Sequence, residues 1–326
     1  MKALARRALL FAALGLALYA TLFAAADRLV LRTGHAHPLF KIATAGERDF
    51  DWVILGASHA MPLDFDGVNA DLERATGLRI VNLAAQGTGP LYQRFVLEEF
   101  LRSHRARHLL YAVDSFAFYS KTWNEERFAD AKLLRRTPFS AATAGHLWRY
   151  VVEENVDPRA WLDYATGFSK VNDRERFQRD AWEGEAQFDR VFRPSSSALA
   201  KRIEYLYPGA PDPARLARYL GDLTALVEAA RQSGMTVTVI RMPVPAEYLR
   251  RLPGEAVFAS ALAEALRARD VPIHDFSASL PDAKLYFDTD HLNRAGVARF
   301  VEERLRPILT GGTGATIDQG SRHERG

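Results

Sequence analysis

The chain has 326 residues, with 43 Lys and Arg against 40 Asp and Glu, 48% hydrophobic residues and no cysteine. These proportions are typical of a globular protein and exclude a disordered, collagen-like or many-pass membrane chain. The lack of cysteine excludes disulfide frameworks, thiolate metal sites and cysteine nucleophiles. The net charge is only +3, and no basic run is interleaved with aromatic residues, so nucleic acid is not an expected partner.

The N-terminus carries a membrane-targeting pattern. Three basic residues within the first seven precede an uncharged run over residues 8–26. As a helix this run is about 28 Å long, close to the thickness of a hydrocarbon core. It exceeds the apolar core of about 7–15 residues in cleavable signals, which favours an uncleaved anchor over residues 1–28. The small residues Ala24–Ala26 before Asp27 leave signal cleavage as the alternative.

Positive charge before the span keeps the N-terminus cytoplasmic, so the remainder of the chain faces outward. The Ala- and Arg-rich composition is that of a bacterial chain. We therefore expect a single-pass protein of the bacterial inner membrane, held through residues 8–26, with its main domain in the periplasm.

The body of the chain alternates short apolar runs with helical patterns, beginning near residue 51. We predict strands over residues 52–55, 79–83, 108–113, 235–240 and 271–274. Helices are expected over residues 68–76, 91–103, 213–233, 256–269 and 294–309. Strands separated by helices predict a parallel sheet covered on both faces. The expected fold is thus a doubly wound, flavodoxin-like α/β fold with a five-stranded parallel sheet.

The predicted organisation has four parts. A linker over residues 29–50 follows the anchor, the α/β domain covers 51–310, and a Gly-rich tail over 311–326 is expected to be disordered. Residues 115–211 form an insertion that is too long for a loop and rich in aromatic residues. We expect it to be mostly helical. Its aromatic side chains either form a small satellite core, which is the favoured interpretation, or line a groove.

Polar residues occur in three segments, after the first and second predicted strands and before the last helix, at the end of the sheet where parallel α/β proteins bind ligands. Ser58 lies where the chain leaves the first strand, and His291 and Asp288 precede the last helix. A serine becomes a nucleophile when a nearby base takes its proton, and a carboxylate orients that base. Each element alone is common in proteins, since an Asp-x-x-His before a helix is often only a cap. Together they predict a Ser–His–Asp site.

The order and spacing of these segments resemble the SGNH (GDSL-like) hydrolase superfamily. Gly56-Ala57-Ser58 matches its nucleophile block, and residues 288–296 match its Asp-x-x-His block. The resemblance implies Ser58 as nucleophile, His291 as general acid and base, and Asp288 as the orienting carboxylate. It also implies an oxyanion hole formed by the N–H groups of Ser58 and Gly87.

One block departs from the family. Where the family has Gly-x-Asn-Asp, this chain has Asp114 and Ser115 at the end of the third strand. An ionised Asp cannot donate a hydrogen bond and repels a developing oxyanion. Ser115 and Gln86 are candidate substitutes for the missing donor. The pattern resembles the membrane-anchored branch that includes alginate O-acetylation proteins and the D-alanyl transfer protein of teichoic acid synthesis.

The sequence leaves two possible roles open for several other polar residues. His59 either contacts substrate or caps the turn after Ser58, and Arg241 either binds an anionic substrate group or forms a surface ion pair. Carboxylates and imidazoles also suit divalent metals, but the spacing does not favour a metal site, so no metal or cofactor is expected. The residues weighed for such a site are Asp64, Asp66, Asp288, Asp290, His59 and His291.

The sequence predicts a serine esterase or O-acyltransferase that acts on acyl groups of cell-envelope glycans. Its expected partners are an acylated glycan or another ester substrate, and a membrane-bound acyltransferase is a further candidate. The candidate substrate-binding residues are His59, Gln86, Asp114, Ser115 and Arg241. The alternative is a non-catalytic, degenerate SGNH module that binds glycan or scaffolds such an acyltransferase.

Overall fold

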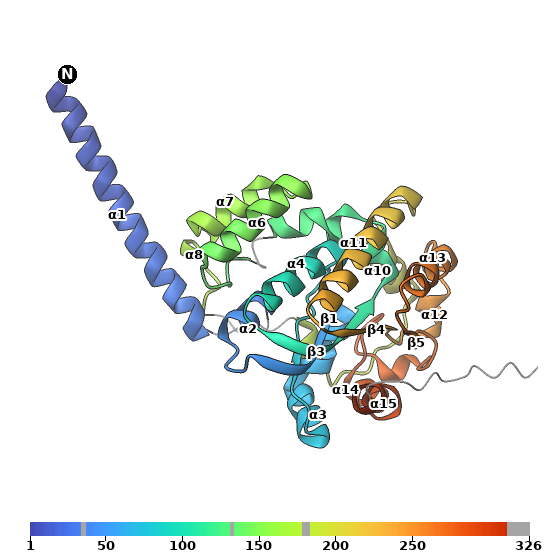
Figure 1. The fold of residues 1–326 in the computed structure, drawn as a ribbon. Helices are drawn as coiled ribbons and strands as arrows, with labels where there is room; N and C mark the ends of the chain where they lie inside the picture. Colours follow the sequence, from blue (N-terminus) through green and yellow to red (C-terminus); the bar gives the residue numbers. More distant parts are fainter. Residues whose placement is uncertain (34–36, 131–133, 178–182, 312–326) are drawn as a thin grey trace, which may run out of the picture.

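The computed structural model describes residues 1–33, 37–130, 134–177 and 183–311 (Figure 1). A five-stranded parallel sheet forms its centre, in the order β2-β1-β3-β4-β5. The strands are β1 (Asp49–Gly56), β2 (Ile80–Asn82), β3 (Arg105–Val113), β4 (Thr236–Arg241) and β5 (Ile273–Asp275). The chain winds outward in both directions from β1, so the predicted doubly wound fold is confirmed.

Helices cover both faces of the sheet because alternate side chains of each strand enter separate cores. Val53 and Leu55 of β1 pack into one core, whereas Trp52 and Ile54 pack into the other. The helices on the first face are α2 (Pro38–Thr44), α4 (Pro90–Leu101), α11 (Pro213–Gln232) and α13 (Glu255–Arg267). Those on the second are α3 (Val68–Thr76), α14 (Arg294–Phe300) and α15 (Arg306–Gly311), the last two joined by a π-helical turn over Val301–Leu305.

The predicted insertion is mostly helical where the structure describes it. Three 3₁₀ turns come first, over Ser115–Phe118, Lys121–Trp123 and Glu125–Ala129. They are followed by α6 (Ala141–Glu153), α7 (Pro158–Thr166), α8 (Phe168–Val171), α9 (Glu183–Ala186) and α10 (Ser196–Leu206). A short helix, α12 (Ala246–Leu249), lies outside the insertion and follows β4.

The aromatic residues of the insertion do not form the separate small core that we expected. Eight of them join the same core as the sheet and α4, because the insertion packs directly on that layer. They are Phe116, Phe118, Tyr119, Trp123, Phe128, Tyr150, Tyr164 and Tyr207. Phe139 and Trp148 are exposed, and Trp182 lies outside the described residues.

The N-terminal helix α1 (Lys2–Thr33) projects away from the rest of the molecule (Figure 1). It is long and apolar enough to cross a membrane, and no residue of its most apolar stretch is buried. The helix extends beyond residue 28, the predicted end of the anchor, and the predicted linker also contains α2. Of the predicted tail, residue 311 ends α15, and residues 312–326 lie outside the described residues.

Candidate active site

The chain leaves β1 through a tight turn that places Ser58 at the carboxyl end of the sheet. Gly56 has φ +152°, and a Cβ at this position would lie 2.8 Å from the carbonyl oxygen of Ala112 on neighbouring β3. Glycine is therefore required both by the dihedral angle and by the space. Ala57 is extended, and a 3₁₀ segment begins at Ser58. Ser58 is therefore the first residue of that segment, two positions after the end of the strand.

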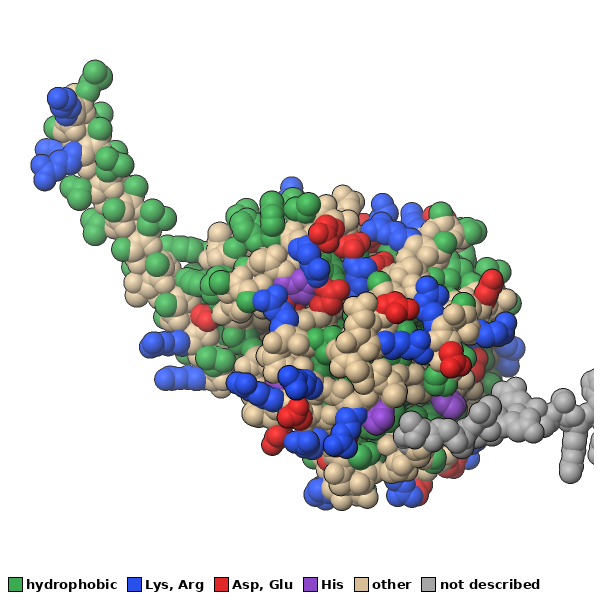
Figure 2. All heavy atoms as spheres, in the orientation of Figure 1, with side chains coloured by type: hydrophobic (Ala, Val, Ile, Leu, Met, Phe, Trp, Pro, Cys, Tyr) green, Lys and Arg blue, Asp and Glu red, His purple; other side chains and the backbone are tan. Residues whose placement is uncertain are grey.

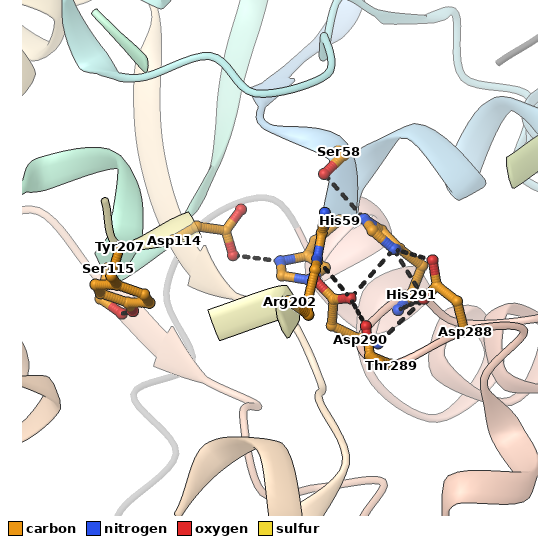
Figure 3. A network of polar contacts seen from close by, with 10 residues as sticks. All are labelled: Ser58, His59, Asp114, Ser115, Arg202, Tyr207, Asp288, Thr289, Asp290 and His291. Atoms are coloured by element: carbon orange, nitrogen blue, oxygen red, sulfur yellow. Dashed lines mark hydrogen bonds and ion pairs between the residues drawn. The ribbon is translucent and has the colours of Figure 1, made fainter. Parts of the chain in front are cut away.

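Ser58, His291 and Asp288 form one continuous chain of hydrogen bonds (Figure 3). Oγ of Ser58 lies 2.9 Å from Nε2 of His291, and Nδ1 of His291 lies 2.9 Å from each carboxylate oxygen of Asp288. The main-chain N–H of His291 also donates to Asp288, at 2.8 Å. Ser58 and His291 are buried, whereas the Asp288 side chain is partly exposed. Residues 233 positions apart in the chain thus meet at one edge of the sheet.

This arrangement defines which nitrogen of His291 carries the proton in the neutral ring. A carboxylate accepts hydrogen bonds only, so Nδ1 donates to Asp288 and Nε2 keeps its lone pair. That lone pair accepts the hydroxyl proton of Ser58. The geometry is therefore suited to activate a serine for attack on a carbonyl carbon.

The backbone N–H groups of Ser58 and Gly87, the two donors expected from the sequence, donate no backbone hydrogen bond within the described part of the chain. Gly87 has φ +61°, and a Cβ would lie 2.7 Å from the indole of Trp123. Trp123 therefore supports the loop after β2 directly beneath Gly87. Free N–H groups beside a nucleophile are the donors that an oxyanion requires.

A second histidine, His59, lies beside His291 and is held between two carboxylates. Its Nδ1 is 2.5 Å from Asp114 and its Nε2 is 3.1 Å from Asp290. Burial alone would lower the pKa of His59, but the Asp114 and Asp290 carboxylates outweigh burial and raise the pKa to about 10. Since both ring nitrogens donate to carboxylates, His59 is an imidazolium. Its ring centroid lies 4.9 Å from that of His291.

Asp290 connects both histidines to the insertion. It is fully buried and accepts hydrogen bonds from Nε (3.0 Å) and Nη2 (2.8 Å) of Arg202 on α10. Burial alone would raise the pKa of Asp290, but Arg202, His291 and His59 together hold it well below its usual range. One Asp290 oxygen also lies 3.6 Å from Nδ1 of His291. We call His59, Asp114, Asp290 and Arg202 the His59 network.

Two residues of the His59 network, together with the neighbouring His291, form a candidate metal cluster. Ligand atoms of His59, Asp290 and His291 all lie within 4.8 Å of one another. However, both ring nitrogens of His59 already contact carboxylates, and Nε2 of His291 contacts Ser58. A cation would have to break these hydrogen bonds. Because Arg202 and His59 already balance the two carboxylates of the network, the donor set fits internal ion pairing better than metal binding.

The remaining candidate residues from the sequence lie in different surroundings. Gln86 is exposed after β2. The Ser115 hydroxyl contacts Tyr207 (2.7 Å) and Glu255 (2.6 Å), so its hydrogen bonds are made with the insertion and α13. Arg241 is buried and pairs with Glu255 and, at 2.7 Å, with Asp275. The Arg241 guanidinium is thus buried, while its partner Asp275 is exposed, so the expected ion pair is present at the protein surface.

A small cavity of about 20 Å³ lies on the far side of the His59 network. It is lined by Asp114, Arg241 and Tyr248, among others, and is large enough for about one water molecule. Oδ2 of Asp114 is buried and accepts no hydrogen bond from a described residue. A single water in the cavity would satisfy it. The cavity is too small to hold an acyl chain or a sugar.

Sequence reasoning did not find Arg202, and it weighed Asp290 only as a metal ligand. Arg202 lies in the insertion, among residues with no recognisable motif, so nothing in its neighbourhood pointed to the site. Asp290 did carry a signal, because it lies between Asp288 and His291 in the last block. A buried carboxylate inside such a motif requires a cationic partner.

Comparisons with known proteins give likenesses to solved structures alone. No family model matches the chain, and no curated protein matches it. Among solved structures, a protein from Bacteroides fragilis described as a "putative acylhydrolase", determined by crystallography at 2.00 Å resolution, matches with 10% sequence identity. The match covers 83% of this chain and 93% of that chain, with a TM-score of 0.44.

Proposed function

We propose that this chain is a serine esterase or O-acyltransferase of the SGNH type, which acts on acyl groups of cell-envelope glycans outside the bacterial inner membrane. The observation that carries the proposal is the hydrogen-bonded chain from Oγ of Ser58 through His291 to Asp288. Its three members come from two distant segments and meet at the sheet edge where parallel α/β proteins bind ligands.

In the first half of the reaction, Nε2 of His291 takes the hydroxyl proton as Oγ of Ser58 attacks the ester carbonyl carbon. The carbonyl oxygen gains the negative charge, and the N–H groups of Ser58 and Gly87 donate to it. The intermediate collapses, the bond to the alcohol oxygen breaks, and His291 returns the proton to that oxygen. The products are the free alcohol and an acyl-enzyme on Ser58.

In the second half, water or a glycan hydroxyl attacks the acyl-enzyme while His291 takes its proton. The bond from the acyl carbon to Oγ breaks, and His291 gives the proton back to Ser58. Water yields a free carboxylic acid, and a hydroxyl yields a new ester. Asp288 stabilises the imidazolium that His291 becomes in each half.

The His59 network supports this chemistry by balancing charge beside His291. Its two cations, His59 and Arg202, balance its two carboxylates, Asp114 and Asp290. The ring centroid of His59 lies 4.9 Å from that of His291, and the Asp114 and Asp290 carboxylates compensate the positive charge of His59 at this position.

The location outside the membrane and the glycan substrate rest on other observations. The long apolar helix α1 follows three basic residues within the first seven positions, a pattern that keeps the N-terminus cytoplasmic. The class of substrate rests on the resemblance of the sequence blocks to the membrane-anchored branch. Most aromatic residues of the insertion are buried in the core and are not available to stack on a sugar.

The test is acyl release by the full chain in detergent, first with p-nitrophenyl acetate and then with an O-acetylated oligosaccharide. Ser103→Ala is a matched control, since Ser103 also contacts a histidine (His104, 2.8 Å) but lies before β3, at the opposite edge of the sheet. We expect Ser58→Ala to lower acyl release by about 10³-fold or more and Ser103→Ala to leave it unchanged.

An acceptor oligosaccharide added to the same assay distinguishes the two forms of the proposal. Transfer of the acetyl group to the added sugar defines the O-acyltransferase, and release of acetate alone defines the esterase. Equal activity of Ser58→Ala and the parent chain would contradict both forms.

A further inference from the structure

The membrane helix α1 is fixed to the insertion by contacts on one helix face. The hydroxyl of Tyr19 donates to the carbonyl of Thr166 at 3.1 Å, and the ring of Phe23 packs edge-on against Phe139 at 5.5 Å. The ring of Phe23 also fills the space where Gly167 lacks a side chain. Because positions four apart lie on one face of a helix, α1 has a defined orientation on α7 and α8.

An ion pair between the partly exposed Asp27 and a buried lysine continues this attachment by one more turn. Asp27 pairs with Lys170, whose ammonium is buried and also donates to the Thr137 carbonyl at 2.8 Å. The main-chain N–H of Phe139 donates to the same Asp27 carboxylate at 2.9 Å. A hydrogen-bonded charge pair with one buried member is specific in geometry, so α1 does not swing freely about the domain.

The length of α1 then places part of the insertion at membrane depth. Between Arg7 and the first contact at Tyr19 there are only residues 8–18, about 16 Å of helix. A hydrocarbon core is about 30 Å thick, so the span must include Tyr19 and Phe23. Whatever contacts these two residues lies level with the outer part of the bilayer.

The surface of the insertion at this level is apolar. It exposes five large apolar side chains on α6, α7, α8 and the segment before α6, which we call the α6–α8 patch. They are Phe139 (38% exposed), Trp148 (47%), Val152 (66%), Leu162 (54%) and Phe168 (63%). Figure 2 shows hydrophobic side chains gathered over α6 and α7 on the side of the domain next to α1.

Helix α6 carries one uncharged stripe on its exposed surface. Ala141, Gly145, Trp148 and Val152 follow one another at helical spacing and are all exposed, and the exposed charged residues Arg149 and Glu153 lie beside this stripe. A surface helix in water normally carries charged residues across its outer face. Tryptophan is also typical of the boundary between lipid and water.

We propose that the α6–α8 patch lies in the outer interface of the same membrane that α1 spans. The inference rests on the proposed membrane location of α1 but is independent of the catalytic site. The domain is then held by two attachments, one transmembrane and one interfacial, which set its height and its rotation above the lipid. In water, an exposed apolar patch of this kind would promote aggregation, whereas contact with lipid removes its side chains from water.

The test uses the absence of cysteine in the chain, which permits single labels. Leu162→Cys and Phe168→Cys are each labelled with an environment-sensitive fluorophore in the full chain, reconstituted into nanodiscs of phosphatidylcholine and phosphatidylglycerol. Quenching by nitroxide-labelled lipid is compared with quenching by aqueous iodide. Leu14→Cys, in the apolar run, controls for insertion of α1, and Val257→Cys, exposed on α13, controls for water. All four side chains are exposed, so no variant opens a core.

We expect labels at residues 162 and 168 to be quenched by lipid nitroxide and protected from iodide, as at residue 14, whereas the label at 257 responds to iodide only. If the label at residue 14 is quenched by lipid nitroxide but the labels at residues 162 and 168 respond to iodide, the inference about the patch is wrong. The membrane location of α1 is then still supported. Protection of 162 and 168 from both quenchers would mean a protein partner covers the patch, which also overturns the inference. If 14 is not quenched by lipid, the membrane location and the patch fail together, with the esterase proposal unaffected.

Discussion

The carboxylate of Asp114 lies 2.5 Å from Nδ1 of His59, so the acidic residue at the end of β3 pairs with a histidine. From the sequence alone, an ionised Asp in place of the expected Asn donor would repel the oxyanion. The ion pair compensates that charge next to the nucleophile. The negative charge at residue 114 is therefore matched by a positive charge at residue 59.

Removing the charge of Asp114 should destabilise the fold. In Asp114→Asn the buried imidazolium of His59 loses one of its two carboxylates, and breaking a buried ion pair costs about 3–5 kcal/mol. Urea unfolding of the full chain in detergent measures this change. Asp71→Asn is the matched control, because Asp71 forms an exposed pair with Arg74 and should cost about 1 kcal/mol or less. Equal effects of the two substitutions would contradict the buried ion pair.

The His59 network should also make stability depend on alkaline pH. The pKa of His59 is raised to about 10 in the folded chain, from an ordinary 6.5. Its contribution is therefore complete below about pH 6.5 and is lost as pH rises toward 10. The difference in unfolding free energy between the parent chain and His59→Gln should shrink over this range. A difference that stays constant from pH 6 to 10 would show that His59 is not charged in the fold.

Arg202 should act as a positioning residue through Asp290. In Arg202→Ala the buried carboxylate of Asp290 loses the guanidinium that holds it beside the two histidines. We expect kcat for acyl release to fall by about tenfold with little change in KM. Lys201→Ala, exposed on the same helix, should change neither. A kcat in Arg202→Ala equal to that of the parent chain, or a change in KM alone, would contradict a positioning role for Arg202.

Asp288 should be required for the correct tautomer of His291. An amide at this position donates as well as accepts, so Asp288→Asn permits the tautomer in which Nε2 carries the proton and no longer accepts from Ser58. Substitution of this kind in a Ser–His–Asp triad lowers kcat by about 10⁴-fold. Stopped assays of acyl release measure it, with Asp282→Asn as a control that retains a capping side chain. Retention of full activity in Asp288→Asn would remove Asp288 from the site.

Gly56 should tolerate no side chain. An alanine Cβ would meet the Ala112 carbonyl at 2.8 Å in a backbone conformation that favours glycine, so Gly56→Ala should cost about 1–3 kcal/mol and displace Ser58. Gly221→Ala on α11 is the control, because its Cβ meets open space and alanine favours the helix. Thermal unfolding separates the two, and a stable, active Gly56→Ala would contradict the tight turn.

Much of the fold and part of the site could be predicted from the sequence, because their signals are local. Short apolar runs between helical patterns marked every strand, and the segments around Ser58 and Asp288–His291 were recognisable as blocks. The His59 network could not be predicted, because its members come from four separate segments and only the folded insertion brings Arg202 to Asp290. The position of the insertion's aromatic residues also depends on how the insertion packs against the sheet layer, and composition alone does not predict that packing.

The central claim is that Ser58 is an activated nucleophile. Its most direct test is intact-mass and peptide mapping of the full chain after exposure to a fluorophosphonate, which bonds to the oxygen of an activated serine with loss of fluoride. We predict a single adduct on Ser58, absent from Ser58→Ala and formed much more slowly in His291→Ala. Labelling of the folded chain that is unchanged in Ser58→Ala, or no labelling at all, would contradict the assignment.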